Sequence, residues 1–214
     1  SKSSPIERDF KIKFSNTDPR YGKINVIEAA NHPNLLAVRE KVTNNKKQHT
    51  KDIIETQKRE RINHPYLLTL HDHSTTTKGG LCSKMHKLRE FWDHSRGDLK
   101  QEMHQRTRSN RDYTDQELTY LLNRTLHALS HLHQHHIAHR EVSPLYIDAG
   151  NPEQLDYRLM ERPENSASFE QVCHNNVMTG KELYAAPEVF ETCKNFKKET
   201  HRPDDYVRQF PSQR

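Results

Sequence analysis

The pattern of apolar and polar positions in the first half of the chain predicts a small, mostly antiparallel sheet with one helix. A polar tail over 1–9 precedes a first strand over 10–14, where apolar and charged residues alternate. An apolar pair at 53–54 among charged residues predicts a helix over 51–62, which the following His-Pro sequence ends. Short apolar runs predict four further strands, the last two joined by a polar connection: 24–27, 35–38, 66–70 and 85–92.

The second half changes to helical periodicity, and a β-rich half followed by a helical half predicts an α+β protein in two lobes. Thr114 and Glu117 have the spacing of a capping box, in which each residue's side chain accepts the other's backbone N–H. Two short strands are expected after the helix, at 146–147 and 157–160. Leucines at helical spacing continue the helix to near Gln134 as one apolar stripe: Leu118, Leu121, Leu122, Leu126, Leu129 and Leu132.

The composition changes this picture in one respect, because it predicts a thin core. Hydrophobic residues make up 31% of the 214 positions, whereas globular domains have roughly 45–50% once glycine is counted. The 34 basic and 29 acidic residues nearly cancel, leaving a formal charge of +5. Self-repulsion is therefore weak, and a thin-cored globular protein fits better than a disordered chain.

Charge and cysteine patterns narrow the classes of partner. Basic residues are interleaved with acidic ones, as in Lys58-Arg59-Glu60-Arg61, so nucleic-acid binding is not favoured. No stretch approaches the roughly 18 consecutive apolar residues of a membrane span, so no membrane partner is expected. The three cysteines are far apart and form no C-x-x-C pair, which favours reduced thiols and a cytoplasmic or similar reducing compartment. They are Cys82, Cys173 and Cys193.

Two motifs point to a family. The leucine-rich helix runs into His-Arg-Glu-Val-Ser-Pro at 139–144, and Gly-Lys-Glu-Leu-Tyr-Ala-Ala-Pro-Glu follows at 180–188. In this order and spacing they resemble the catalytic loop and the end of the activation segment of eukaryotic protein kinases. The resemblance extends over roughly 10–205. It implies a bilobal fold with an N-lobe over 10–92 and a partial C-lobe over 93–214, the latter containing a catalytic loop (139–147) and an activation segment (156–188).

The resemblance also implies a set of site residues. Glu141 and Arg140 lie in the catalytic loop, and Glu55 takes the place of the glutamate on the N-lobe helix. Arg39 stands where the family has its phosphate-binding lysine. The implied nucleotide site is completed by the end of the glycine-rich loop, the adenine-facing strand, the gatekeeper and the D-F-G carboxylate, which would also be the metal ligand: Gly22, Ala37, Phe91 and Asp156, the last opening the sequence Asp156-Tyr157-Arg158.

Several of the charges needed for phosphoryl transfer are replaced, and each replacement weakens the chemistry. Thr17 and Pro19 stand at two glycine positions of the phosphate loop, where a missing N–H and added Cβ atoms impair a phosphate cradle. Arg39 is not equivalent to lysine, although Lys41 offers a substitute two residues along. Ser143 replaces the catalytic-loop lysine. Architectural positions survive, by contrast: His139, Arg140, Pro144, Glu55, Tyr184, Pro187 and Glu188.

This pattern of loss predicts a catalytically inactive pseudokinase that serves as a scaffold or regulatory module, with no cofactor. The alternative is an active or weakly active Ser/Thr kinase that uses ATP and Mg²⁺ through Glu141 and Asp156. A third possibility is a pseudokinase that binds nucleotide for stability alone. The family continues with more helices after the position of Glu188, so we expect either a fragment or other protein subunits that contact the truncated lobe near 188–214, in a large assembly such as a cytoskeletal one.

Three local alternatives stay open in the sequence. Arg39 and Glu55 form an ion pair, or both are solvated. Glu141 acts as a base, or it hydrogen-bonds nearby backbone. His131 and His135 have the i, i+4 spacing of a metal-binding pair, but no Cys or Asp joins them as a third ligand, and the kinase-like pattern already accounts for that stretch.

Overall fold

The computed structural model describes residues 2–79, 84–150, 155–161 and 184. The chain forms two compact units, Ser1–Pro163 and Glu164–Arg214, and the first contains every element considered below. It is an α+β structure with one five-stranded antiparallel sheet, one two-stranded sheet and three α-helices among the described residues. The coarse fold class expected from the sequence is therefore confirmed.

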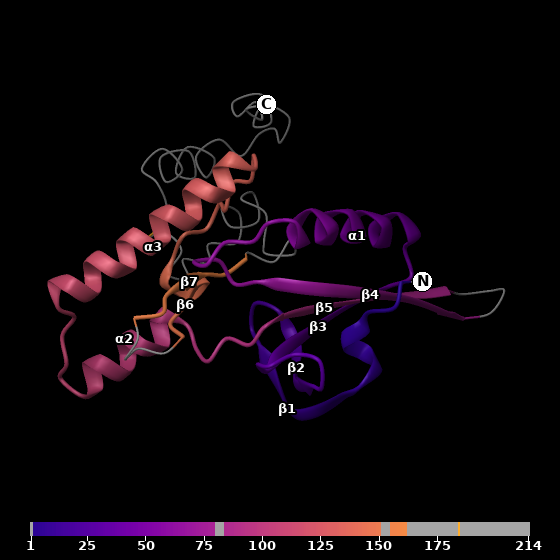
Figure 1. Ribbon diagram of the computed structural model, residues 1–214, viewed down its shortest axis with the longest axis horizontal. Helices are drawn as coiled ribbons and strands as arrows, with labels where there is room; N and C mark the ends of the chain where they lie inside the picture. The colour runs from indigo at the N-terminus through magenta and orange to yellow at the C-terminus, as the bar shows by residue number, and fades with distance from the viewer. Residues whose placement is uncertain (1, 80–83, 151–154, 162–183, 185–214) are drawn as a thin grey trace, which may run out of the picture. The chain divides into compact units, whose positions relative to one another are not determined.

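The large sheet has the strand order β1-β2-β3-β5-β4, and all neighbouring strands are antiparallel (Figure 1). Four predicted strands, those at 10–14, 24–27, 35–38 and 85–92, are found, and each is longer than predicted. The strand expected over 66–70 is wrong, because that segment is irregular and β4 begins only at residue 70 and continues through the polar connection. The strands are β1 (Phe10–Asp18), β2 (Gly22–Ala29), β3 (Leu36–Thr43), β4 (Leu70–Gly79) and β5 (Lys84–Asp93).

Strand register sorts the apolar side chains of the sheet onto its two faces. Ala37 pairs with Trp92, so both point to one face, whereas Val38 pairs with Phe91 and both point to the other. The first face carries an apolar cluster that includes Trp92 and Met160. The second packs against Ile6, which lies in a short 3-10 helix η1 (Pro5–Arg8). The segment expected to be a polar tail is thus part of the core.

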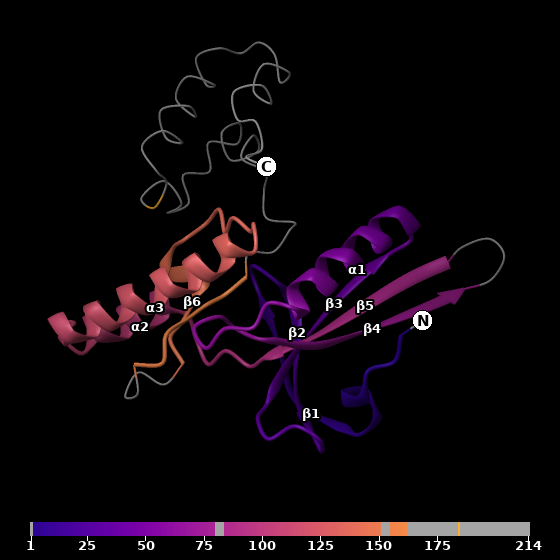
Figure 2. The same ribbon diagram turned by 45° about the horizontal axis from the view of Figure 1, so that its top comes forward.

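Helix α1 (Lys46–Glu60) lies along the first face, over β3, β5 and β4 (Figures 1 and 2). It begins five residues before the predicted start, because the Asn45 side chain accepts the backbone N–H groups of Lys47 and Gln48. Its buried positions are mostly polar, and Thr56 and Arg59 face the sheet. The contact between helix and sheet is therefore made largely by hydrogen bonds and charge.

The helical part follows β5. Two short strands, β6 (Ile147–Asp148) and β7 (Arg158–Leu159), pair with each other, and the 3-10 helix η2 (Pro144–Tyr146) precedes β6. The α3 capping box is confirmed, with both reciprocal hydrogen bonds present. Helix α2 is not anticipated by the sequence, because its buried positions include Glu102 and Arg106, which look like surface residues in a hydrophobicity pattern. The elements are α2 (Leu99–Arg108), α3 (Asp115–Gln134), η2 (Pro144–Tyr146), β6 (Ile147–Asp148) and β7 (Arg158–Leu159).

The leucines of α3 do not form a single buried stripe. Leu132 is buried, and Leu121 and Leu129 pack against the same core cluster. Leu118, Leu122 and Leu126 are 47%, 60% and 54% exposed. The expectation of one core-facing stripe is therefore wrong: α3 has a second apolar row, spaced by four residues, that faces away from the core. No helix in the part of the chain that the structure describes is long and apolar enough to cross a membrane.

A buried ion network joins α2 to α3. Arg106 donates to Glu102 at 2.8 Å and to Glu117 at 2.6 Å, and Glu117 also accepts the Thr114 backbone N–H at 2.8 Å. These hydrogen bonds, that from Arg106 first, lower the pKa of Glu117 to about 2. The stability that Glu117 contributes is therefore present above the usual carboxyl pKa of 4.5. It is lost as the pH falls from there toward the lowered pKa of about 2.

We predict that Glu117→Ala lowers the free energy of unfolding by about 3 kcal/mol, because it leaves a buried guanidinium short of one carboxylate and removes a helix cap. Urea denaturation followed by circular dichroism measures the loss. As the control, Glu28→Ala breaks an exposed pair with Lys13, made at 3.0 Å, and should cost less than about 1 kcal/mol. Equal losses in the two variants would contradict the network's role.

Candidate functional site

A cluster of charged side chains lies buried between the sheet and α1. Its centre is Glu90 on β5, which is 5% exposed. Its carboxylate accepts from Thr56 of α1 at 2.7 Å and from the Trp92 indole at 3.3 Å, and it lies 3.3 Å from the Lys41 ammonium. Burial opposes ionisation, but Lys41 and these hydrogen bonds hold the pKa of Glu90 below its usual value. Glu90 is thus a paired, ionised carboxylate that joins β3, β5 and α1.

Arg39 lies directly opposite Glu90 in the strand register. Its guanidinium carbon is 3.6 Å from the centroid of the Tyr21 ring and 4.6 Å from that of the Trp92 ring. Its Nε atom is buried and has no hydrogen-bond partner among the described residues. The guanidinium is therefore enclosed by two aromatic faces, which stabilise a cation through their π electrons.

Glu161 brings a second carboxylate to this cluster from the end of β7. The Tyr21 hydroxyl donates to the Glu161 carbonyl at 2.6 Å, which fixes the backbone there. Burial raises the pKa of Glu161 to about 7, although the nearby cations of Arg59 and Arg39 oppose the shift. The site therefore contains a carboxyl group that is poised to titrate near neutral pH.

The sequence analysis did not anticipate Glu90 or Glu161 as site residues. One sequence signal could have pointed to Glu161. In the family that the motifs resemble, the metal-binding carboxylate follows a strand. Here Glu161 follows strand β7, whereas Asp156 precedes it. Nothing in the sequence marks Glu90, because its role depends on cross-strand pairing with Arg39. Lys41, named only as a substitute, is the ammonium group that pairs with Glu90.

Glu55 lies apart from Arg39. Its carboxylate is 3.6 Å from the Lys58 ammonium on the same helix, and its side chain is 42% exposed. Arg39, by contrast, is 8% exposed. The sequence left two alternatives, an ion pair or two solvated charges. In the described structure the two residues form no ion pair, and Glu55 is exposed whereas Arg39 is buried.

The other residues of the implied nucleotide site are distributed over the sheet. Gly22 begins β2 with φ at 71°, a left-handed conformation that favours glycine, and so closes the β1–β2 turn. Ala37 shares its sheet face with Trp92. Phe91 points to the opposite face, into the cluster with Ile6. Ala37 and Phe91, both expected at the nucleotide site, therefore lie on opposite faces of the sheet, and Trp92 packs in the same cluster as Ala37.

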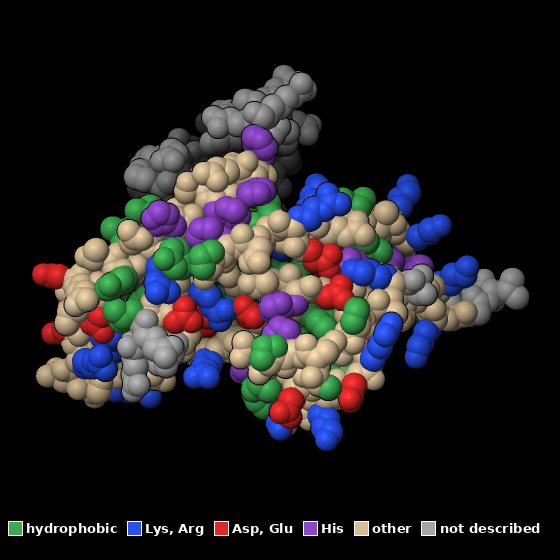
Figure 3. All heavy atoms as spheres, viewed as in Figure 1, with side chains coloured by type: hydrophobic (Ala, Val, Ile, Leu, Met, Phe, Trp, Pro, Cys, Tyr) green, Lys and Arg blue, Asp and Glu red, His purple; other side chains and the backbone are tan. Residues whose placement is uncertain are grey.

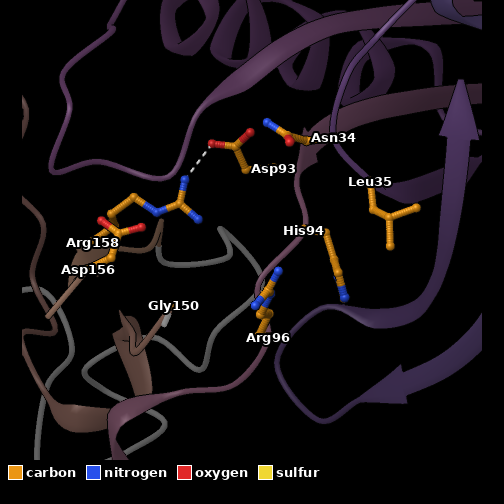
Figure 4. A pocket seen from close by; sticks show the side chains of 8 residues that line it. All are labelled: Asn34, Leu35, Asp93, His94, Arg96, Gly150, Asp156 and Arg158. Carbon is orange, nitrogen blue, oxygen red and sulfur yellow. Dashed lines mark hydrogen bonds and ion pairs between the residues drawn. The ribbon is translucent and has the colours of Figure 1, made fainter. Parts of the chain in front are cut away.

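Asp156 lines a separate polar cavity of about 430 Å³ (Figure 4). Its carboxylate is 3.1 Å from Arg124 of α3. Arg158, on the same cavity, binds Asp93 at 2.7 Å and Asp148 at 2.8 Å, so both of these carboxylates are already paired. Neither Arg39 nor Ala37 lines this cavity. The lining residues are Asn34, Leu35, Asp93, His94, Arg96, Gly150, Asp156 and Arg158.

The loop that resembles a catalytic loop is anchored by its histidine. His139 is 7% exposed, and its Nε2 lies 2.7 Å from the Met160 carbonyl at the end of β7. Arg140 is exposed and has φ at 65°, and the partly buried Glu141 donates its backbone N–H to His139 Nδ1 at 3.4 Å. Tyr184 is 49% exposed, and the rest of the motif at 180–188 lies outside the described residues.

One group of side chains has the composition of a metal site. Glu60, Asp72 and His73 place a ligand atom each within 4.8 Å of one another. The Lys2 ammonium, however, lies 2.8 Å from Asp72, 3.1 Å from His73 and 3.6 Å from Glu60. The charge of the two carboxylates is therefore partly offset by a cation of the chain itself, and the cluster docks the N-terminal segment on β4.

No protein-family model matches this chain, and no curated protein matches it. The resemblance to protein kinases therefore rests on the order and spacing of the sequence motifs alone.

We predict that Glu161→Gln stabilises the protein at pH 8 and leaves its stability at pH 5 unchanged. The raised pKa means that the buried carboxyl favours its neutral form, so wild-type stability is lost as the pH rises from about 4.5 to about 7. Glutamine mimics the neutral form, and the gain at pH 8 should be about 1–2 kcal/mol. Urea denaturation at pH 5, 6.5 and 8 measures it. Histidine titrations cancel in the difference between variant and wild type.

The matched control is Glu55→Gln, which removes a carboxylate of the same kind from an exposed position on α1. It should give no pH-dependent gain. If Glu161→Gln destabilises the protein equally at all three pH values, Glu161 is an ordinary paired carboxylate.

Proposed function

We propose that this chain is a protein kinase-like binding module that does not transfer phosphate and acts as a scaffold or regulator within a larger protein assembly, in a reducing compartment such as the cytoplasm. The α+β architecture supports this proposal, with a small antiparallel sheet, one helix against it and a helical part after it. So does His139, which anchors the loop at 139–144 to the end of β7.

The enclosure of Arg39 is the observation on which the inactive assignment mainly rests. The resemblance gives this position to the residue that binds the nucleotide phosphates, and such a residue must present its charge to a ligand. Here the guanidinium lies against the rings of both Tyr21 and Trp92, and Arg39 is 8% exposed. A cation desolvated in this way contributes to packing and is not available to phosphate oxygens.

The other residues present do not fit Mg-ATP either. Lys41 is paired with Glu90, and Asp156 with Arg124. Thr17 lies near the end of β1 and Pro19 in the β1–β2 turn, where Pro19 has no N–H to offer an anion. We therefore derive no catalytic step through ATP and magnesium for this chain.

A partner surface is supported by the second apolar row of α3. Leu118, Leu122 and Leu126 recur every four residues and are each about half exposed. Such a row favours an apolar partner segment, because covering it removes apolar area from water. A protein subunit with an amphipathic helix has the matching chemistry.

An active Ser/Thr kinase remains the alternative, and one observation favours it. The charges of Arg59, Arg39 and Lys41 act on the pKa of Glu161, which follows β7, so a carboxylate and several cations lie in the same region. In that case Glu161 would hold the metal and Glu141 would be the base. The enclosure of Arg39 is the main evidence against it.

We predict that Mg-ATP leaves the melting temperature of the protein unchanged, because the phosphate-binding position is occupied by an enclosed guanidinium. Differential scanning fluorimetry with millimolar Mg-ATP, Mg-ADP and ATP with EDTA measures this. A ligand present at 100 times its Kd would stabilise the fold by about 2.7 kcal/mol, which is easily detected.

The result also separates the three functional readings. A magnesium-dependent shift with phosphate transfer to a Ser/Thr peptide would establish the kinase. A shift without transfer would leave a pseudokinase that binds nucleotide for stability. A shift of the melting temperature of either kind contradicts the proposal that the enclosed Arg39 guanidinium is not available to phosphate.

We predict that a photo-crosslinking amino acid at Leu122 forms adducts with another protein in cells, because this position is exposed in the apolar row of α3. The matched control is the same amino acid at Lys47, which is exposed on α1 outside that row. Adducts at 122 and none at 47, detected by mobility shift and mass spectrometry, support a partner on α3. Equal adduct yields at the two positions would argue against it.

A further inference from the structure

The exposed face of α3 that carries the leucine row continues beyond the row at both ends. Leu118, Leu122 and Leu126 are each about half exposed and recur every four residues. Asp115 lies seven residues before Leu122, and His133 lies seven residues after Leu126. Because seven residues are close to two helical turns, both polar side chains lie on the face of the row. We call these five residues the α3 stripe.

The two ends of the α3 stripe have complementary chemistry. Asp115 and His133 are exposed, and neither side chain has a hydrogen bond or ion pair among the described residues. Figure 3 shows histidine side chains (purple) over the C-terminal half of α3, whereas the first turn is acidic. An imidazole N–H can donate to a carboxylate in either protonation state. The 18 positions between the two residues separate them by about 27 Å along the helix, so they cannot meet within one chain.

The α3 stripe matches itself in the antiparallel direction. Asp115 and His133 are each nine residues from position 124, and Leu122 and Leu126 are each two residues from it. If a second α3 lies antiparallel across the first with these midpoints together, Asp115 of each copy meets His133 of the other. Leu122 then meets Leu126. A two-fold axis makes each contact twice and closes the assembly at two chains.

We propose that the α3 stripe binds the same stripe of a second copy of this chain, as an antiparallel and two-fold symmetric pair of helices. This inference rests on the proposed function, which assigns the leucine row to a protein partner, and it names that partner. The partner needs an amphipathic helix with an apolar row, and α3 is itself such a helix. The charges favour the antiparallel pair, because a parallel pair would bring the acidic ends together.

The contact is a small one. Leu118 lies opposite the exposed Ser130 of the other copy, so the apolar centre consists of Leu122 and Leu126 from each chain. One face of a 20-residue helix from each copy gives a small interface, and small interfaces are weak and transient. We therefore expect a concentration-dependent equilibrium between monomer and dimer in the micromolar range.

The test is sedimentation equilibrium of the purified full chain from about 1 to about 200 µM, a range that spans the Kd values of weak dimers. The average mass should rise from that of one chain toward that of two. Leu122→Glu places a carboxylate in the apolar centre and should keep the protein monomeric throughout. The matched control is Ile54→Glu, which makes a similar change at a half-exposed position of α1 and should associate as wild type does.

Two charge variants test the antiparallel arrangement. Asp115→Arg removes a carboxylate that is used twice in the dimer and should weaken association about three- to tenfold. Combining Asp115→Arg with His133→Glu exchanges the chemistry of the two ends and should restore association. Circular dichroism shows whether each variant is folded.

Three results would overturn the proposal: a wild-type chain that stays monomeric at the highest concentration, association that folded Leu122→Glu leaves unchanged, or no restoration in the folded double variant. Crosslinking at position 122 in cells separates this inference from the proposed function. A monomeric chain that crosslinks there to a different protein overturns self-association and leaves the scaffold proposal standing. The absence of any adduct at 122 contradicts the partner surface itself.

Discussion

The ion pair of Glu90 and Lys41 is the interaction on which the arrangement of the sheet and α1 depends. A buried carboxylate needs hydrogen-bond or ion-pair partners for its oxygens. Glu90 has Lys41 on β3, Thr56 on α1 and Trp92 on its own strand. A chain with 31% hydrophobic residues has few apolar side chains for this role. Paired charges therefore occupy buried positions between its elements, both around Glu90 and where Arg106 joins α2 to α3.

The same requirement explains why the described residues that the motifs assign to a nucleotide site have their charges paired or enclosed. Lys41 serves Glu90, and Arg39 is covered by Tyr21 and Trp92, so both cations stabilise the fold. The proposal of a protein-binding module is consistent with this arrangement, and the exposed leucine row of α3 is the surface that the proposal assigns to a partner.

Much of the fold follows from the sequence, and the failures have identifiable causes. The runs at 10–14, 24–27 and 35–38 become strands because alternating or β-branched apolar residues suit a half-buried sheet. The β4 strand was missed because its buried residues are His73, Ser74 and Thr75, which the N-terminal segment covers through backbone hydrogen bonds between Lys2 and Thr75. Of the candidate site, Arg39 could be foreseen, but its aromatic enclosure could not.

The sequence by itself determined the local features: the capping box of Thr114 and Glu117, the period of α3 and the α+β order of elements. These depend on residues within a few positions of one another, where spacing fixes geometry. Only the tertiary structure decided that Ala37 faces Trp92 while Phe91 faces away, that Glu90 and Glu161 meet Arg39, and that His64 reaches His131. Those contacts join residues far apart in the chain, and strand register and helix packing set them.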